Sequence, residues 1–249
     1  MLTEERRAVI LNLLKTNGIV KTQDLMHQLN CSESTIRRDL DSLHNEGKLK
    51  RIHGGAKRIY QLSEELTVDE KSVKNTQEKE IIGKYAASLI EENDIIYLDA
   101  GTTTLAMIPF IKNGNITVVT NGIQHASYLI DQNIETILIG GKIKQSTKAV
   151  IGATGLSELR KYRFNKAFLG INGIDTEFGC TTPDPEEAAL KTLAQEQSSI
   201  TYALADHTKW KKVNFVHVFN LEDVTIITNE SNEDLTSFHE KTTILEAKK

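Results

Sequence analysis

Two adjacent arginines, Arg37 and Arg38, are the side chains of this sequence best suited by type and position to bind an ordered polyanion. They lie in the segment 33–46, whose apolar residues recur at helical spacing and would bury one face. These apolar residues are Ile36, Leu40 and Leu43. The arginines then face away from the buried side in the first turns of the helix. That part of a recognition helix meets base edges in the major groove of DNA.

The chain around this helix supplies its boundaries and a second basic element. Ser32 is placed to cap the helix start, and Gly47 is placed to end it in a left-handed conformation. The segments 49–53 and 56–59 then flank Gly54-Gly55, which predicts a β-hairpin. A basic hairpin beside a recognition helix is typical of a winged helix-turn-helix.

Two further helix patterns, Thr3–Lys15 and the segment that begins at Thr22, precede the recognition helix and complete the expected module. An ordinary helical hairpin with two solvated arginines is the alternative interpretation of the helix pair alone. The basic hairpin makes DNA binding the more specific interpretation. The residues predicted to contact DNA are Ser34, Thr35, Arg37, Arg38, Lys50, Arg51, His53 and Lys57.

Composition agrees with a nucleic-acid-binding module attached to a larger domain. The 249 residues carry a formal net charge of −4, unevenly distributed: residues 1–58 hold 11 Lys and Arg against 7 Asp and Glu, and the rest hold 19 against 27. No apolar run of membrane-spanning length and no secretory pattern occurs, so we expect a cytoplasmic protein. Cys31 and Cys180 lie in different predicted domains, which argues against a disulfide framework. We expect no metal and no cofactor.

Polarity shifts divide the chain into a winged helix-turn-helix at 1–58, a polar linker at 59–76 and a larger domain at 77–249. Helices and strands alternate in the larger domain, which predicts a Rossmann-like, largely parallel α/β sheet covered on both faces. The expected helices are Gln77–Ile90, Thr102–Ile111 with Pro109 bending or ending it, one that ends at Asp131, and Pro185–Gln197. The expected strands are Ile95–Leu98, Ile116–Val119, Glu135–Ile139, Lys166–Leu169, Ile200–Ala205 and Val224–Thr228.

Ligands of such sheets bind outside the carboxyl ends of the strands. The loop 99–104 (Asp-Ala-Gly-Thr-Thr-Thr) joins a strand to a helix and offers backbone N–H groups and hydroxyls as a cradle for a phosphate. Its glycine spacing is not that of a Walker loop. Asn121-Gly122, Gly140-Gly141 and 170–173 follow other strands. Glycine and threonine also serve the geometry of such loops, but four loops at one edge favour a binding site.

Carboxylates and a lysine add possible chemistry. Asp175 follows the 170–173 turn, and Glu187 lies four residues before Lys191 on one helix face. An exposed ion pair is the usual interpretation of that spacing.

The segment S-E-S-T-I-R-R-D-L-D-S-L, followed by R-I-H-G-G-A, resembles the DNA-binding signature of DeoR-type bacterial transcription regulators. The later motifs D-A-G-T-T, T-N-G, G-G, G-x-N-G-x-D and E-A-A-L-K resemble the effector domain of the same family. That domain is similar in fold to ribose-5-phosphate isomerase and glucosamine-6-phosphate deaminase, which implies a sugar-phosphate ligand. Asp206 and Lys209 match the family pattern D-H-x-K, although a strand-end Asp that caps a turn explains Asp206 equally well. The residues predicted to bind the effector are Asp99, Gly101, Thr102, Thr103, Thr104, Asn121, Gly140, Gly141, Gly173, Asp175, Glu187, Lys191 and Lys209.

Within the family, SESTIRRDL and RIHGGAK look closest to repressors of fructose or lactose phosphotransferase operons. The resemblance implies a repressor of a sugar operon that fructose 1-phosphate or tagatose 6-phosphate releases from operator DNA. A single recognition helix has a small footprint, so we expect a homodimer or homotetramer. Two alternatives remain at this point: a sugar-phosphate isomerase or deaminase with a DNA-binding appendage, and a transcriptional activator.

Overall fold

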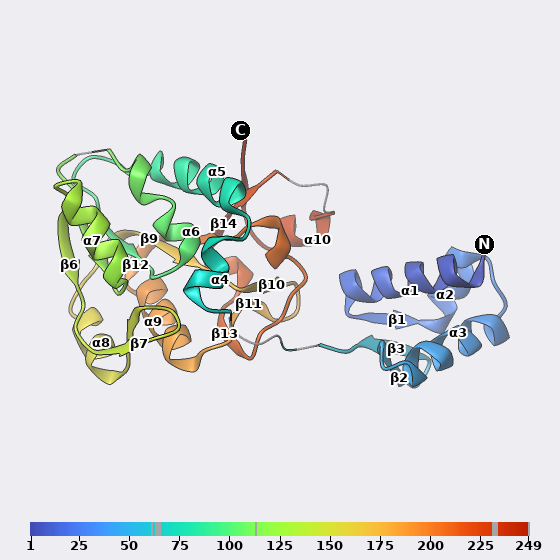
Figure 1. The fold of residues 1–249 in the computed structure, drawn as a ribbon. Coiled ribbons are helices and arrows are strands. Elements are labelled where there is room, and N and C mark those ends of the chain that lie inside the picture. Colours follow the sequence, from blue (N-terminus) through green and yellow to red (C-terminus); the bar gives the residue numbers. More distant parts are fainter. Residues whose placement is uncertain (61, 63–65, 113, 231–233, 249) are drawn as a thin grey trace. The chain divides into compact units, whose positions relative to one another are not determined.

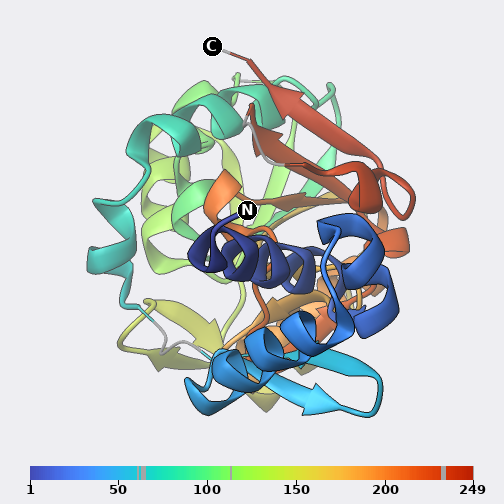
Figure 2. The same ribbon diagram turned by 90° about the vertical axis from the view of Figure 1, so that its right-hand side faces the viewer.

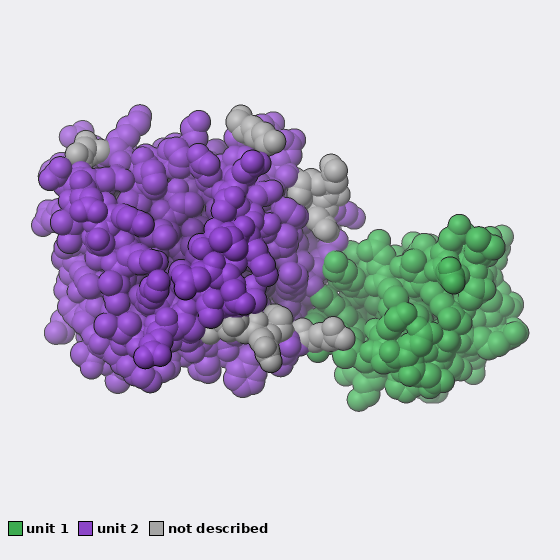
Figure 3. Space-filling view, viewed as in Figure 1, with its two compact units in different colours: residues 1–61 green, residues 62–249 purple. Residues whose placement is uncertain are grey.

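The computed structural model describes residues 1–60, 62, 66–112, 114–230 and 234–248. The chain forms two compact units, Met1–Gln61 and Leu62–Lys249, which Figure 3 distinguishes by colour. Each unit has its own hydrophobic core: one cluster of buried residues in the smaller unit and two in the larger.

The smaller unit has the predicted winged helix-turn-helix. Its elements are α1 (Thr3–Asn17), β1 (Ile19–Lys21), α2 (Thr22–Leu29), α3 (Glu33–Asn45), β2 (Leu49–Ile52) and β3 (Gly55–Arg58). The three strands form an antiparallel sheet in the order β1-β3-β2, and the β2–β3 hairpin is visible in Figure 2. β1 was not predicted from the sequence, because its three residues are too few to show an alternating pattern.

The larger unit is built on a parallel sheet of seven strands within the described residues. They are β4 (Ile95–Leu98), β5 (Thr117–Thr120), β6 (Glu135–Leu138), β9 (Phe164–Gly170), β12 (Ser198–Leu204), β14 (Thr225–Asn229) and β15 (Ile244–Ala247). Their order is β15-β14-β12-β9-β4-β5-β6, and every pairing is parallel. Figure 1 labels β6, β9, β12 and β14 of this sheet. Along β4, Tyr97 packs into the core on one face, whereas Ile96 and Leu98 pack into the core on the other. Both faces are therefore buried, which confirms the predicted fold class.

The helices of this unit are α4 (Val68–Ser72), α5 (Thr76–Ala87), α6 (Thr102–Leu105), α7 (Ile123–Asp131), α8 (Ala153–Leu159), α9 (Pro185–Glu196) and α10 (Thr236–His239), with short 3₁₀ turns at Ile108–Phe110, His207–Lys209 and Leu221–Asp223. The helix expected over Thr102–Ile111 is wrong in extent. It ends at Leu105, and a separate 3₁₀ turn contains Pro109. Three consecutive threonines are weak helix formers, and Pro109 has no N–H with which to continue a helix.

Two small antiparallel elements complete the larger unit. One is the sheet of β10 (Gly173–Asp175), β11 (Gly179–Thr182) and β13 (Val216–Phe219), and the other is the hairpin of β7 (Lys142–Lys144) and β8 (Ala149–Ile151). Several predicted effector residues lie within these elements or at their ends.

The predicted linker 59–76 contains a short helix, α4. Residues 61 and 63–65 lie outside the described residues, but Thr67 caps α4, and Val68 is buried in the larger unit. The polarity of this stretch concealed the short helix α4, in which Val68 is the buried residue.

Close packing of α5 on α6 makes Gly83 sensitive to substitution. A Cβ at Gly83 would lie 2.7 Å from the carbonyl carbon and oxygen of Ala106. At an open helical site, alanine would gain about 1 kcal/mol over glycine. Here, Gly83→Ala should lower the free energy of unfolding by about 1–3 kcal/mol, because the backbones must separate. Urea unfolding measures the effect, and Gly140→Ala, whose Cβ would meet ordinary contact distances, is the control. Parental stability of Gly83→Ala would contradict this packing.

Candidate functional site

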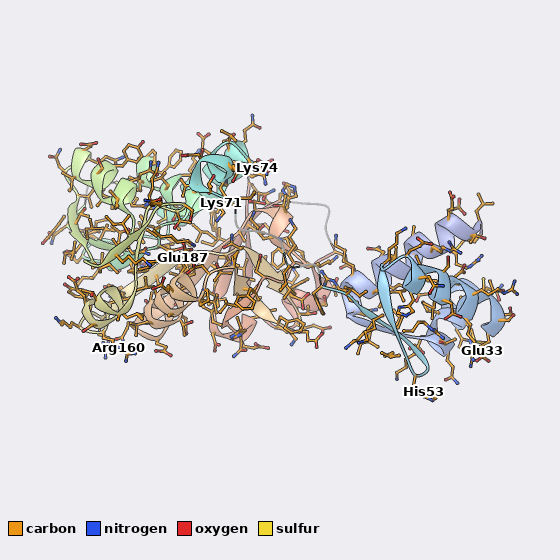
Figure 4. All side chains as sticks on the ribbon, turned by 60° about the horizontal axis from the view of Figure 1, so that its bottom comes forward. Glu33, His53, Lys71, Lys74, Arg160 and Glu187 are labelled. Carbon is orange, nitrogen blue, oxygen red and sulfur yellow. The ribbon has the colours of Figure 1, made fainter. Side chains whose placement is uncertain are left out.

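The recognition helix α3 has the predicted geometry. The Ser32 hydroxyl accepts a hydrogen bond from the Thr35 N–H at 3.3 Å, and Gly47 is left-handed with φ of +69°. The apolar stripe is fully buried, and both arginines are exposed. Arg37 donates to the Glu33 carboxylate at 2.8 Å, and Arg38 donates to the Ser34 carbonyl at 3.4 Å. Figure 4 labels Glu33 on this helix.

Asp39, which sequence reasoning missed, joins α3 to α1. Its carboxylate accepts from Arg6 at 2.5 Å and from Arg7 at 3.2 Å. This hydrogen bonding raises the pKa of Arg6 and keeps its charge opposite the buried Asp39. The signal available in the sequence was a charged residue inside the apolar stripe. The pair fixes the orientation of the recognition helix on the rest of the unit.

The wing places two lysines side by side. Lys50 and Lys57 are directly opposite each other in the β2–β3 register, and both are exposed. Like charges in such a pair destabilise a hairpin, whereas a phosphate between them would relieve the repulsion. Arg51, in contrast, is held by Asp41 at 3.1 Å. His53 lies at the tip of the hairpin in Figure 4.

Replacing Lys50 and Lys57 with Gln should weaken binding to all DNA sequences alike. Each lost phosphate contact should flatten the slope of log affinity against log salt concentration by about 0.9. Fluorescence anisotropy over a series of salt concentrations measures this slope. The matched control is Lys84→Gln/Lys161→Gln, which removes two exposed lysines from the larger unit. An unchanged slope would restrict the wing to a structural role.

The larger unit contains a cavity of about 350 Å³ at the carboxyl ends of β4, β9 and β12. The predicted effector residues that line it are Asp99, Gly101, Thr102, Thr103, Glu187, Lys191 and Lys209. Their elements converge here because parallel strands end at one edge of the sheet. The loop after β4 contributes Asp99, and the start of α6 contributes Thr102 and Thr103. Glu187 and Lys191 come from α9, and Lys209 comes from the turn after β12.

Six predicted effector residues do not line this cavity: Thr104, Asn121, Gly140, Gly141, Gly173 and Asp175. Thr104 and Asn121 are buried supports. The Thr104 hydroxyl donates to the Asp99 carbonyl at 2.5 Å, and Asn121 accepts from the Ala100 N–H at 2.9 Å and donates to the Val150 carbonyl at 3.2 Å. Both therefore hold the threonine loop from behind.

The other four lie within the small antiparallel elements or beside them. The Gly140 N–H donates to Glu158 at 2.7 Å, and a Cβ on Gly141 would lie 2.9 Å from a β8 carbonyl. Gly173 lies in β10, tightly packed against the Lys212 carbonyl. Asp175 closes the β10–β11 turn by accepting from the Glu177 N–H at 2.9 Å. Glycine signals for hairpins and for ligand loops look alike in one sequence, so these positions were assigned to the site.

Asp99 and Lys191 form a buried ion pair, and the side chain of each is 5% exposed. Asp99 also accepts from the Gly170 N–H at 3.0 Å. Glu187 does not pair with Lys191 but accepts from the Thr147 hydroxyl at 2.7 Å and from Lys144 at 3.3 Å. The i,i+4 spacing therefore places both side chains toward the cavity, where each finds a different partner.

Asp206 is buried at the end of β12, where it caps a turn and lines the cavity. One carboxylate oxygen accepts from the Thr208 N–H at 3.0 Å, which caps the turn after β12, and the residue also lines the cavity. The other oxygen lies 3.5 Å from the Lys209 ammonium. The hydrogen bonds and the nearby ammonium lower the pKa of Asp206 despite its burial, so the group is ionised at neutral pH.

Sequence reasoning missed the cavity residues that precede and begin α5. These are Leu66, Val68, Lys71, Lys74, Asn75 and Lys79. Burial lowers the pKa of Lys79, whose ammonium donates to the carbonyls of Lys71 and, at 2.6 Å, Lys74. Lysines repeated at 71, 74 and 79 in the presumed linker were the available signal.

His125 supports the threonine loop as a neutral imidazole. Its Nε2 lies 3.1 Å from the Gly101 carbonyl and 3.1 Å from the Thr104 hydroxyl. Burial lowers the pKa of His125 to about 4.

This depressed pKa makes stability depend on pH. The unfolded chain binds the histidine proton below pH about 6.5 and the folded chain does not, so folding weakens as pH falls from 6.5 towards 4. At pH 5 the loss should be about 2 kcal/mol relative to pH 7.5. His125→Gln should remove this part of the pH dependence, whereas His27→Gln at an exposed site should retain it. Urea unfolding at the two pH values measures it; identical pH dependence in the parent and His125→Gln would contradict the burial argument.

Within the described residues, no helix is long and apolar enough to cross a membrane. The same residues contain no group of three or more His, Cys, Asp or Glu side chains placed to hold a metal ion.

Both units match models of known protein families. A DeoR-like helix-turn-helix domain model matches residues 6–61, and a DeoR C-terminal sensor domain model matches residues 74–230. The two units thus define a DNA-binding regulator with a sensor domain. The chain belongs to the DeoR family of transcriptional regulators.

Named relatives span nearly the whole chain. A Bacillus subtilis (strain 168) protein named uncharacterized HTH-type transcriptional regulator FruR is 47% identical over 98% of both chains. The lactose phosphotransferase system repressor of Staphylococcus aureus (strain NCTC 8325 / PS 47) is 32% identical over 92% of this chain and 93% of its own. Among solved structures, ribose 5-phosphate isomerase A of Methanocaldococcus jannaschii is 14% identical over 55% of each chain, with a TM-score of 0.41.

Proposed function

We propose that this protein represses a sugar-utilisation operon and is released from operator DNA by a phosphorylated sugar, with fructose 1-phosphate and tagatose 6-phosphate favoured. The observation that carries this proposal is the lining of the cavity. Six lysines and three carboxylates give it a formal excess of three positive charges, beside two threonine hydroxyls from α6. An anion with several hydroxyl groups matches that chemistry. The name of the Staphylococcus aureus relative supports a phosphotransferase-linked sugar.

The test is an operator-release titration of the full chain. DNA upstream of its own gene and of adjoining sugar genes serves as the binding probe, with fructose 1-phosphate and tagatose 6-phosphate as effectors. Unphosphorylated fructose is the control for the phosphate requirement. Release by either phosphosugar, without release by fructose, supports the proposal. No response to any phosphosugar contradicts it.

A phosphosugar isomerase or deaminase with a DNA-binding appendage remains the alternative from another class. Asp175, Glu187 and Lys191 are the residues that could carry out such a reaction. Glu187 and Lys191 line the cavity, but Asp175 closes a hairpin turn outside it. This arrangement favours binding over turnover. Incubating the full chain with each phosphosugar and analysing the products tests the enzyme, and transcription from the operator with and without protein separates repression from activation.

We also propose that the protein acts as a homodimer or homotetramer, because one recognition helix covers only one half-site. Analytical ultracentrifugation of the full chain, free and bound to operator, gives the subunit number. A monomer on DNA would contradict this part of the proposal.

A further inference from the structure

The segment 66–75 forms one wall of the cavity. Most of this segment lies outside both family matches. The helix-turn-helix match ends at residue 61, and the sensor match begins at residue 74. Five of the ten residues between 66 and 75 nevertheless line the cavity; they are Leu66, Val68, Lys71, Lys74 and Asn75. We call this segment the strap. Along the chain it joins the wing to the sensor domain.

A small number of contacts attach the strap to the sensor domain. The Val68 N–H donates to the Ser146 carbonyl at 2.9 Å, and the Val68 side chain is the buried apolar anchor. Asn75 donates to the Asp206 carboxylate at 3.1 Å, and Asp69 lies 3.6 Å from Lys148. Most other strap residues are exposed. A segment with one buried apolar side chain and few polar contacts opens at a lower free-energy cost than a core element.

Lys79 fixes the position of the two strap lysines, Lys71 and Lys74. The buried Lys79 ammonium donates to the backbone carbonyls of Lys71 and Lys74 and so holds both residues at the cavity rim. Figure 4 shows Lys71 and Lys74 close together on this segment. The positive charges of Lys71 and Lys209 also oppose that of Lys79. Lys71, Lys79 and Lys209 therefore bring several positive charges together at the cavity.

The carboxylates of the cavity are already matched to lysines of the sensor domain. Asp99 pairs with Lys191, and Asp206 lies beside Lys209. The strap contributes two further lysines, Lys71 and Lys74, to the lining of the cavity. A dianion in the cavity would be attracted by the lysines of the strap and of the sensor domain and would relieve their mutual repulsion.

We propose that Lys71 and Lys74 bind the anionic group of the effector, so that the ligand closes the strap onto the sensor domain and changes the tether of the DNA-binding unit. This inference rests on the proposed sugar-phosphate function and assigns its anion contacts and its route of regulation. The ligand can stabilise the closed strap only by the difference between its binding free energies for the closed and the open state.

The test uses the full chain and two measurements. Calorimetry gives the affinity for fructose 1-phosphate, tagatose 6-phosphate and inorganic phosphate, and hydrogen exchange follows the amides of residues 66–75. Lys71→Gln/Lys74→Gln should weaken sugar-phosphate binding at least about tenfold, since each tenfold step corresponds to about 1.4 kcal/mol, within the range of one charge-assisted hydrogen bond. Lys71→Arg/Lys74→Arg should bind nearly as the parent does. Lys84→Gln/Lys161→Gln, outside the cavity, is the charge-matched control.

In the parent, ligand should slow exchange across the strap, and the Gln pair should abolish that protection while its circular dichroism stays parental. Protection by inorganic phosphate alone also supports the strap, because it shows that the anion is sufficient. Parental affinity of the Gln pair, or an unprotected strap in the liganded parent, overturns the strap proposal and leaves the sugar-phosphate function intact. A parent that binds neither phosphosugar nor phosphate overturns both.

Discussion

Arg38→Ala should lose most of the protein's preference for its operator over random DNA, whereas Arg37→Ala should weaken both affinities by a similar factor. On α3, Arg38 follows Ser34 by one turn and lies opposite the buried stripe, and Arg37 lies on the flank beside Glu33. The first position faces base edges when the helix enters a major groove, and the second faces the backbone. A lost bidentate base contact costs about 1–3 kcal/mol, or roughly 5- to 150-fold in operator affinity.

Anisotropy titrations with operator and with random DNA, each at several salt concentrations, separate the two functions. Arg37→Ala should reduce the salt slope by about 0.9, which a base contact would not require. Arg160→Ala, an exposed arginine of the larger unit, is the control. If both helix variants bind operator as tightly as the parent does, the assignment of α3 as the recognition helix is wrong.

The helix-turn-helix was predictable because its signals are local. Ser32, the apolar stripe and Gly47 each specify one feature of a single helix, and the Gly54-Gly55 pair specifies the turn that follows. The structure has the cap, the buried stripe, the left-handed Gly47 and the hairpin. The turn lies one residue earlier than predicted, at His53-Gly54, because Gly55 pairs with Ile52 as the first residue of β3. The expected strands of the sheet also occur, within two residues of the predicted ends, because strands buried on both faces appear as apolar runs.

The cavity was predictable only in part because its walls depend on long-range contacts. Strand order brings Asp99 to Lys191, 92 residues later in the chain, and no local pattern contains that pairing. The strap was missed for the opposite reason: its polar sequence is typical of a linker, and its position depends on Lys79 and on Asp206, 131 residues beyond Asn75. Gly140, Gly141 and Gly173 were predicted to lie in ligand loops, but none of them lines the cavity, and a Cβ at Gly141 or Gly173 would come too close to a backbone carbonyl.

Thr103→Val and Lys191→Ala should leave operator binding by the free protein intact and blunt its release by sugar phosphate. Both residues line the cavity and belong to the sensor unit, whereas the DNA-binding residues belong to the other unit. Thr103→Val removes one hydroxyl at nearly constant volume, so the sugar-phosphate concentration for half-release should rise about tenfold, the equivalent of one strong hydrogen bond. Lys191→Ala should have the larger effect and should produce a super-repressor.

The two variants differ in their effect on stability, which makes the pair informative. Lys191→Ala leaves the Asp99 carboxylate buried without its cation, and breaking such a pair costs about 3–5 kcal/mol. Thr103→Val avoids that cost, so a loss of release in this variant reports on the ligand site itself. Thr225→Val, a strand position outside the cavity, is its matched control. The measurements are urea unfolding and operator release titrated with fructose 1-phosphate and tagatose 6-phosphate. Parental release by both cavity variants would place the effector elsewhere in the sensor domain.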